Sequence, residues 1–576
     1  MNDLDTNETS LLIPRSGVPY DEPDTRLSHQ RLLAIYSILA STALERLAFY
    51  SLVINLIFTL QLSELDWNSA NSVTASFIFF GTSYISTLVF AVLSDAKLGR
   101  ARTIIIGFFV YIIGYTIVSL ISNTTTHAFF CRSSSKNNET NIDSIIDEHC
   151  AGPVIGTLIF TAIGVGATQA NMAVFGAEQV QESNKPSRYF DKYIIAINIG
   201  GIFATLLVPY IQVTQSDPNR FFHGYLVSGS LLVGAFLLFI LGYRFYIHIE
   251  PHDTIITKCI PVIINAFQTW RKYKVAQSET TNILKKSSST NLLEESITNH
   301  EDQLITVKEY SYSFLDFARA SNNGKFIDRV VDDVRSLRRV IVVFLLLMPY
   351  WLVYYQIQTT FFLQGEHMYI PYISNVTQTK MPVIWMSVGD QVSIIIGILI
   401  LNLFVYKHLV NYNQSSLIQI KFVIGMILAS ITMFIAGTIE KFRQHECHPG
   451  KNNSDLSIFT QLPQYICMGV SEVFGMVASF EFAYMAAPRS AQSLIMSLRF
   501  CSLGLSSFIG DAYVKVMTIT IKNLDFDCQN SKEILYIYFY VLGGIQLLTI
   551  FVFVLCHRKF GILQLNPYQI NKKQFI

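Results

Sequence analysis

The chain has 576 residues, of which 51% are hydrophobic and 14% are charged, with a formal net charge of +1. Soluble domains carry roughly 25% charged residues, so this composition indicates a surface that largely faces lipid. The near-neutral charge argues against a nucleic-acid partner. The sequence contains no phosphate-binding loop, metal-ligand cluster or catalytic-triad spacing, so we expect neither an enzyme nor a bound cofactor.

The first 31 residues are polar and lack the apolar core of a signal peptide. We expect them to form a disordered cytosolic N-terminus. Within it, Glu8 precedes Leu12 and Ile13 with the spacing of an acidic dileucine motif, which sorting adaptors bind. A chance match is the alternative interpretation.

Twelve apolar stretches follow, each long enough to cross a bilayer as a helix of about 20 residues. Lipid offers no hydrogen-bond partner to the backbone, so these spans must be helical. We therefore expect an all-α membrane protein with the bilayer as its surroundings, in which a polar stretch separates six spans from six. The expected parts are the N-terminus 1–31, a six-helix bundle 32–248, a cytosolic linker 249–339, a second six-helix bundle 340–556 and a cytosolic tail 557–576.

Lys and Arg are concentrated in the loops on the side of both termini, which places that side in the cytosol. Four cysteines fall in the opposite loops, where an oxidising compartment favours disulfides. The simplest pairing joins Cys131 to Cys150 and Cys447 to Cys528, with free thiols as the alternative. Glycosylation sequons on the same side begin at Asn123, Asn138, Asn375 and Asn452.

Glu45 and Arg46 lie midway along the first span, and Arg46 is expected to be the only basic residue deep inside any span. A charge at that depth is costly unless it is paired or faces a cavity, so Arg46 is a candidate for binding a carboxylate. A structural ion pair is the alternative. Between the second and third spans, Gly99 permits a tight turn across which Asp95 and Arg100 can pair, as expected of a gating element.

Several short motifs along the chain together resemble those of a known family. They are ERLAFY (45–50), Tyr84 with LGR (98–100), FGAEQ (175–179), INIG (197–200), YYQIQTTFFLQG (354–365), PQY (463–465), EVF (472–474) and EFAY (481–484). Over about residues 32–557 the chain resembles the proton-coupled oligopeptide transporters of the major facilitator superfamily. It is most similar to their peptide/histidine branch.

The resemblance implies roles for individual positions. Arg46 and Tyr50 would meet a substrate carboxylate, and Glu472 would meet the substrate amino group. Tyr84, Asn198, Gln356 and Gln358 would line a polar cavity. Ordinary helix packing is the alternative for these residues.

The sequence also departs from the family pattern. Thr42 stands where the family carries a Glu, Gln169 where it carries a Lys, and Phe77 where some members carry a His. The remaining candidate proton carriers are Glu45, Asp390 and Glu472. These departures leave open whether transport is coupled to protons.

We therefore expect a transporter of small peptides or histidine, driven by protons, in an endolysosomal membrane. An uncoupled facilitator of the same fold is one alternative, and an endolysosomal scaffold that recruits cytosolic signalling adaptors is another. The plasma membrane is the alternative location.

Overall fold

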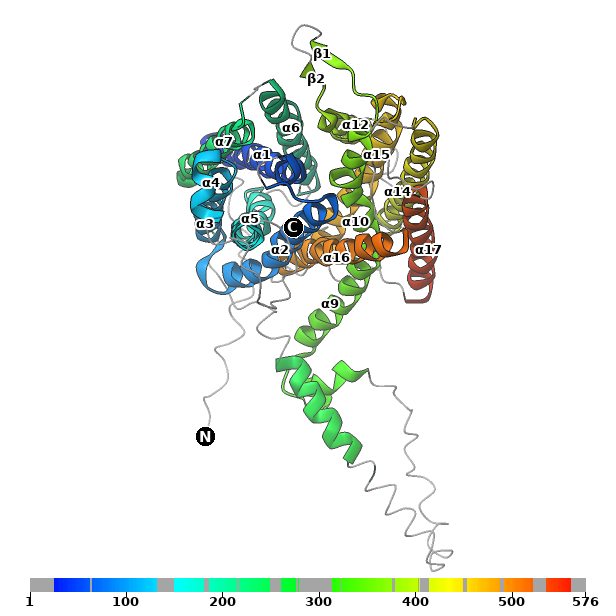
Figure 1. The fold of residues 1–576 in the computed structure, drawn as a ribbon. Helices are drawn as coiled ribbons and strands as arrows, with labels where there is room; N and C mark the ends of the chain where they lie inside the picture. The colour runs from blue at the N-terminus through cyan, green and yellow to red at the C-terminus, as the bar shows by residue number, and fades with distance from the viewer. Residues whose placement is uncertain are drawn as a thin grey trace, which may run out of the picture.

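A computed structural model represents the protein, and its helices form two bundles that lie side by side (Figure 1). The structure describes residues 25–62, 65–131, 150–180, 186–214, 217–248, 261–275, 278, 313–322, 324–374, 379–401, 403, 414–448, 453–486, 492–521 and 535–560. Glu8, Leu12 and Ile13 of the predicted sorting motif lie outside these ranges.

The first bundle contains six long helices. They are α1 (Thr25–Leu62), α2 (Ser69–Leu93), α3 (Arg100–Ile121), α5 (Ala151–Glu178), α6 (Pro186–Thr214) and α7 (Arg220–Gly242), with the short helix α4 (Thr124–Cys131) after α3. A π-helical turn η1 (Ser94–Leu98) continues α2, and a 3₁₀ turn η2 (Tyr243–Phe245) follows α7. Helix α1 packs on α6 and α7, and α5 packs on α2 and α3.

The second bundle is more interrupted. Its helices are α9 (Asp328–Leu346), α10 (Met348–Tyr354), α11 (Thr360–Glu366), α12 (Val388–Ile400), α14 (Gln414–His445), α15 (Leu462–Ala486), α16 (Gln492–Ile521) and α17 (Tyr536–Phe560). Short 3₁₀ turns are η6 (Tyr355–Gln358), η7 (Val383–Ser387) and η9 (Ile458–Gln461). The strands β1 (Tyr372–Ser374) and β2 (Thr379–Lys380) form a small antiparallel hairpin.

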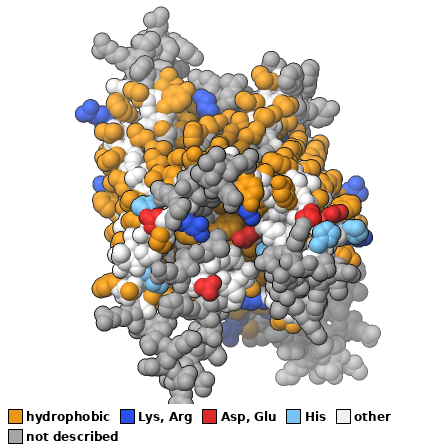
Figure 2. Space-filling view, turned by 45° about the horizontal axis from the view of Figure 1, so that its top comes forward, with side chains coloured by type: hydrophobic (Ala, Val, Ile, Leu, Met, Phe, Trp, Pro, Cys, Tyr) orange, Lys and Arg blue, Asp and Glu red, His pale blue; other side chains and the backbone are white. Residues whose placement is uncertain are grey.

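Twelve helical segments of the described chain are long and apolar enough to cross a membrane. Hydrophobic side chains cover a broad band of the described surface (Figure 2). Leu241, Leu548 and Phe551, for example, expose 70%, 64% and 62% of their area, which suits contact with lipid rather than water. The prediction of an all-α, twelve-span membrane protein is confirmed.

Two helix starts differ from the expected boundaries. Helix α1 begins at Thr25 rather than at residue 32, and α9 begins at Asp328, inside the expected linker 249–339. Polar side chains fill the first turns of α9, which sequence hydropathy assigns to the linker. The hydrophobic part of the seventh span therefore continues a helix that starts outside the apolar region.

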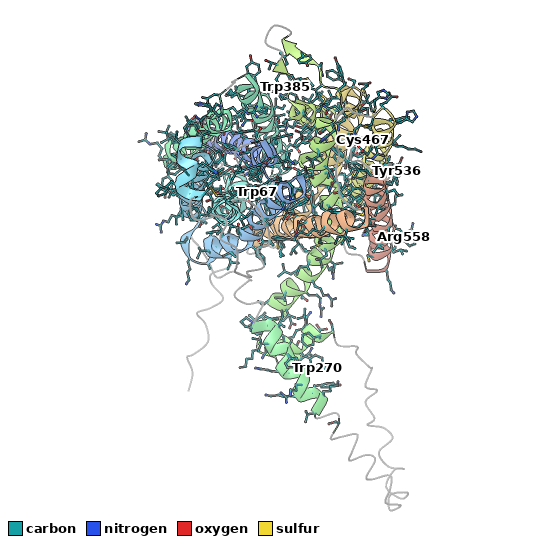
Figure 3. The ribbon with its side chains drawn as sticks, viewed as in Figure 1. Trp67, Trp270, Trp385, Cys467, Tyr536 and Arg558 are labelled. Atoms are coloured by element: carbon teal, nitrogen blue, oxygen red, sulfur yellow. A yellow bond between two sulfur atoms is a disulfide. The ribbon has the colours of Figure 1, made fainter. Side chains whose placement is uncertain are left out.

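The described part of the linker projects from one end of the bundles, and Trp270 lies on this projection (Figure 3). We call this end the linker side and the opposite end, which carries β1 and β2, the hairpin side (Figure 1). Beside α9, Asp316 of the 3₁₀ turn η4 (Phe314–Ala318) accepts hydrogen bonds from Arg319, at 2.8 Å, and from Arg335. A second 3₁₀ turn, η5 (Ala320–Asn322), follows η4. This cluster ties the linker to the start of the seventh span.

The predicted loop cysteines have different outcomes. Cys131 and Cys150 form a disulfide with a Cα–Cα distance of 5.1 Å. Cys447 is also disulfide-bonded, but Cys528 lies outside the described residues, so their pairing stays a prediction. Of the predicted sequons, Asn123 is half-buried and accepts hydrogen bonds from Thr125, whereas Asn138, Asn375 and Asn452 lie outside the described ranges.

The two bundles meet through contacts at both ends. On the hairpin side, the Gln391 amide donates to Thr205 Oγ1 at 3.1 Å, joining α12 to α6. On the linker side, the ring of Phe500 stacks on Tyr84 with centroids 5.9 Å apart, joining α16 to α2. Side-chain contacts therefore join the two bundles toward both sides of the membrane.

Candidate functional site

The seventh span breaks near its middle, and this break shapes the site. Helix α10 gives way to the 3₁₀ turn η6, and Thr359 then adopts φ −133° and ψ −89° before α11 begins. Discontinuous helices at the midplane are how many transporters direct polar groups into a binding cavity. Here the break places Tyr354 and Gln358 together, with the Gln358 amide donating to the Tyr354 hydroxyl at 3.3 Å.

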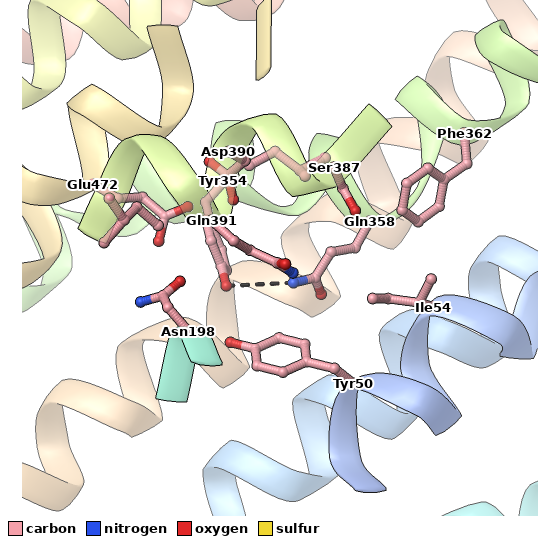
Figure 4. Close-up of a pocket in the computed structure, with 12 residues that line it drawn as sticks. Tyr50, Ile54, Asn198, Tyr354, Gln358, Phe362, Ser387, Asp390, Gln391 and Glu472 are labelled. Carbon is pink, nitrogen blue, oxygen red and sulfur yellow. Dashed lines mark hydrogen bonds between the residues drawn. The ribbon is translucent and has the colours of Figure 1, made fainter. Parts of the chain in front are cut away.

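A cavity lies between the bundles at this break (Figure 4). The first bundle contributes Tyr50, Ile54 and Asn198, so helices α1 and α6 form one wall. The opposite wall comes from the second bundle and consists of Tyr354, Ile357, Gln358, Phe362, Ser387, Asp390, Gln391, Ile394 and Glu472. A ligand in this cavity would touch both bundles at once.

Oxygen acceptors without partners are the main chemical feature of the cavity. One side-chain oxygen of each of Gln358, Asp390, Gln391 and Glu472 is buried and has no hydrogen-bond partner among the protein atoms. Buried polar groups are normally satisfied, and their exceptions call for an explanation. Because all four atoms are acceptors, the cavity is suited to a ligand that donates hydrogen bonds, such as an ammonium group. The two carboxylates can also take up a proton.

Arg46 does not line this cavity. Its guanidinium donates to both oxygens of Glu45 at 2.5 Å, and it lies over the ring of Phe49 with 4.4 Å to the centroid. Both charged side chains are at least 95% buried. In this conformation Glu45 and Arg46 form the structural ion pair that the sequence left as the alternative interpretation.

Tyr84 and Gln356, also predicted to line the cavity, lie elsewhere. Tyr84 is stacked between Phe80 and Phe500 at the contact of the bundles. The Gln356 carbonyl oxygen accepts from Tyr538 at 2.9 Å, so its amide faces α17. Four of the seven predicted substrate residues, Tyr50, Asn198, Gln358 and Glu472, are thus brought together with Asp390.

The predicted gating turn has the expected geometry. Gly99 adopts φ +77°, a conformation that strongly favours glycine. Arg100 pairs with Asp95 at 3.1 Å across the turn, and it also forms a salt bridge with Glu178 at the end of α5. Sequence analysis missed Glu178, although it lies within the FGAEQ motif.

The prediction that Arg46 is the only deep cation is wrong. Arg499 lies on α16 and is 1% exposed, and Lys421 and Arg443 are also buried within helices. Lys421 pairs with Glu481 at 2.8 Å and Arg443 with Glu440 at 2.7 Å. Arg499 differs because the described residues supply no carboxylate to it. Because Arg499 lies near the start of the eleventh span, expected over 491–518, sequence analysis grouped it with the preceding loop.

The three departures from the family pattern place side chains without a titratable group inside the first bundle. The Thr42 hydroxyl donates to the Ile38 carbonyl at 2.8 Å. Gln169 is 9% exposed and is uncharged. Phe77 packs edge-on against Tyr355 with centroids 5.9 Å apart.

Comparisons with known proteins agree with this architecture. A family model described as the POT family matches residues 101–528. Solute carrier family 15 member 3 of Rattus norvegicus is 25% identical over 567 residues, covering 91% of each chain. Protein NRT1/PTR FAMILY 8.1 of Arabidopsis thaliana is 26% identical, covering 91% of this chain and 92% of its own.

The solved structure of the POT family transporter PepTSo is similar in fold, with a TM-score of 0.67 at 21% identity, covering 92% of this chain and 99% of that one. The crystal structure of an auto-inhibited POT family peptide transporter has a TM-score of 0.62 at 19% identity. This likeness extends over both bundles. Because the family model also matches more than half of the sequence, the chain belongs to the POT family of membrane transporters.

Proposed function

We propose that the protein transports small peptides by alternating access and couples this transport to protons. The observation that carries the proposal is the cavity between the bundles, which is lined by residues of both bundles and presents unpartnered acceptors. One of the similar solved structures is that of a peptide transporter, which supports peptides as the substrate class. Free histidine is the alternative substrate.

The substrate amino group would bind at Glu472. This residue is 3% exposed and its Oε1 has no partner, so an ammonium group would supply both the missing charge and the missing hydrogen bonds. Gln358 and Gln391 add carbonyl oxygens around the same space. Tyr50 and Asn198 extend from the opposite bundle, so ligand binding would link the two bundles.

The coupling proton would reside on Asp390 or Glu472. Both carboxylates line the cavity, and each has an oxygen without a hydrogen-bond partner. Two unpaired buried carboxylates are costly to keep ionised, so neutralisation by a proton or by the substrate ammonium is favoured. Glu45 is a weaker candidate, since both its oxygens already accept from Arg46.

An uncoupled facilitator of the same fold is the second candidate function. Its support is the uncharged character of Thr42 and Gln169, which cannot exchange protons during transport. The scaffold function predicted as a further alternative is tested by co-purification of cytosolic proteins with the full-length protein. One set of uptake measurements separates coupled from uncoupled transport.

The test uses the full-length protein in proteoliposomes with a labelled dipeptide. A proton-coupled transporter accumulates the peptide above equilibrium when a proton gradient is imposed, whereas a facilitator only equilibrates it. Asp390→Asn should lose accumulation but keep exchange of internal for external peptide. Asp217→Asn, a change at an exposed carboxylate outside the spans, serves as the control. Absence of both uptake and exchange in the wild type would refute the transport proposal.

Glu472→Gln tests the amino subsite separately. Loss of a charge-assisted hydrogen bond costs about 1.5–3 kcal/mol, or about tenfold or more in affinity. N-acetylation of the peptide should weaken binding by this amount in the wild type and should have little further effect in Glu472→Gln. Equal sensitivity of both proteins to N-acetylation would place the amino group elsewhere.

We also propose that the protein resides in an endolysosomal membrane, based on the dileucine pattern alone. Leu12→Ala combined with Ile13→Ala should then shift a tagged full-length protein toward the cell surface. Surface biotinylation measures the shift, and Leu11→Ala is a matched control. Unchanged distribution would favour the plasma-membrane alternative or another signal.

A further inference from the structure

Arg499 is a fully buried cation for which the described residues supply no counter-charge. Among the side chains that the structure describes, the other buried cations, Arg46, Lys421 and Arg443, each have a carboxylate partner. Arg499 instead donates from Nε to the Ser479 hydroxyl at 2.6 Å, and its Nη2 has no hydrogen-bond partner. A buried charge in this situation is unfavourable unless it serves a ligand.

Aromatic rings hold the guanidinium in place. Its central carbon lies 3.6 Å from the ring centroid of Phe480, 5.0 Å from that of Phe500 and 5.3 Å from that of Trp351. Cation–π contacts stabilise a desolvated guanidinium but do not use its in-plane N–H donors. The rings therefore orient Arg499 and leave hydrogen-bonding capacity for an anion.

The arginine also lies beside a contact between the two bundles. Phe500 stacks on Tyr84 of α2, and Phe480 stacks on Phe190 of α6 with centroids 6.0 Å apart. Separation of the bundles on the linker side would part both pairs of rings. The guanidinium would then be open to whatever occupies the space between the bundles.

The spacing from the cavity fits a short peptide. Ser479, which holds Arg499, lies seven residues after Glu472 on helix α15, which is roughly 10 Å along the helix axis. An extended chain spans about 3.3–3.6 Å per residue, so three residues cover about the same distance. A peptide with its amino end at Glu472 can therefore direct its carboxylate toward Arg499.

We propose that Arg499 binds the substrate carboxylate, so that the second bundle recognises both ends of an extended tripeptide. This rests on the proposed peptide transport. It assigns the anion subsite to Arg499 rather than to Arg46, whose hydrogen bonds in this conformation go to Glu45. A planar guanidinium can bind a carboxylate with two parallel hydrogen bonds, which suits this role.

The test compares binding of tri-alanine and tri-alanine amide to the full-length protein in detergent. The wild type should bind the free acid about tenfold or more tightly than the amide, the size expected for a charge-assisted hydrogen bond. Arg499→Gln should bind both forms equally, with unchanged affinity for the amide. Arg499→Met, whose flexible apolar chain can pack on the same rings, should give the same result. Arg46→Gln should keep the preference for the free acid.

The melting temperature provides a second measurement. Because no carboxylate loses its partner, Arg499→Gln and Arg499→Met should melt at or above the wild-type temperature. A preserved preference for the free acid in both variants would overturn the proposal, as would equal losses for both peptides together with lower melting temperatures. If the wild type transports tri-alanine in these cases, only the assignment of Arg499 fails. A wild type that neither binds nor transports it would refute the proposed function itself.

Discussion

The Glu45–Arg46 pair offers a direct test of how the first bundle holds its buried charges. The two side chains are 5% and 3% exposed, and both contacts between them measure 2.5 Å. Removing one partner of such a pair leaves an uncompensated buried charge and costs about 3–5 kcal/mol. We therefore expect Arg46→Gln to lower the melting temperature by several degrees, even without substrate.

The structure also predicts the order of the single variants. Arg46→Gln strands the Glu45 carboxylate, whereas Glu45→Gln strands a guanidinium that still lies 4.4 Å from the centroid of Phe49. That ring compensates part of the loss, by about 0.5–2 kcal/mol. Glu45→Gln should therefore be the milder single change. The double variant should be more stable than either single variant, because it buries no unpaired charge.

Thermal unfolding of the purified proteins in detergent, followed by size-exclusion chromatography with fluorescence detection, measures these differences. Lys515→Gln is the control. It breaks the salt bridge with Asp511, in which Lys515 is 50% exposed, and loss of such an exposed pair should cost only about 0–1 kcal/mol. Melting temperatures of Arg46→Gln and Lys515→Gln that match each other would refute the structural role of the buried pair. Arg46 would then be free to serve the substrate directly.

Three further predictions concern the ends of the helices. Replacing Cys131 and Cys150 by Ser opens a loop with a sequence separation of 19, which should cost about 3 kcal/mol and lower the melting temperature measured without reductant. Gly99→Val should slow uptake with little change in peptide affinity, because its φ of +77° is strained for other residues although nothing lies within 4 Å of an added Cβ. Burial would raise the pKa of Asp316, but hydrogen bonds from two arginines outweigh it and lower the pKa. Its stabilisation is therefore present above about pH 4 and is lost as the pH falls through the lowered pKa. Proteolysis of the linker at graded pH with an acid-stable protease should accelerate only in that acidic range.

The spans could be predicted from sequence because lipid imposes a single solution on the backbone. Any apolar stretch of about 20 residues must become a helix, and the described helices follow the expected stretches. The boundary at the seventh span could not be predicted in this way. The first turns of α9 are polar, and hydropathy carries no information about a helix that extends into water.

Which side chains face the cavity was harder to predict. An unbroken α-helix would place Gln356 and Gln358 about 200° apart, so the two cannot share a wall. The 3₁₀ turn and the backbone of Thr359 determine that Gln358 enters the cavity while Gln356 bonds Tyr538. A family motif names both residues without distinguishing them, and only the three-dimensional structure separates their environments.

Arg499 was missed for a related reason. It lies seven residues after the start of α16 at Gln492, where a small error in the boundary of the span turns a buried residue into a loop residue. The sequence contained one signal, the adjacent Phe500, but an aromatic neighbour is common in any span. The other two rings around the guanidinium belong to Phe480 and Trp351, which come from two other helices.

The contacts between the bundles limit how the protein can move during transport. Helices α2 and α16 cross closely, since a Cβ on Gly81 would lie 2.5 Å from the Phe508 ring and one on Gly504 would lie 2.9 Å from the Gly81 carbonyl oxygen. Such a tight crossing favours rotation of the bundles as units over local bending. Opening either side therefore breaks contacts there, Thr205 with Gln391 on the hairpin side or Tyr84 with Phe500 on the linker side.

A ligand can accelerate the conversion between the outward-open and inward-open conformations in two ways. It can stabilise the transition between conformations more than the closed state, or it can neutralise charges that make closure unfavourable. The unpartnered oxygens of Asp390 and Glu472 provide that second route, because closure around them is unfavourable until a proton or an ammonium group arrives.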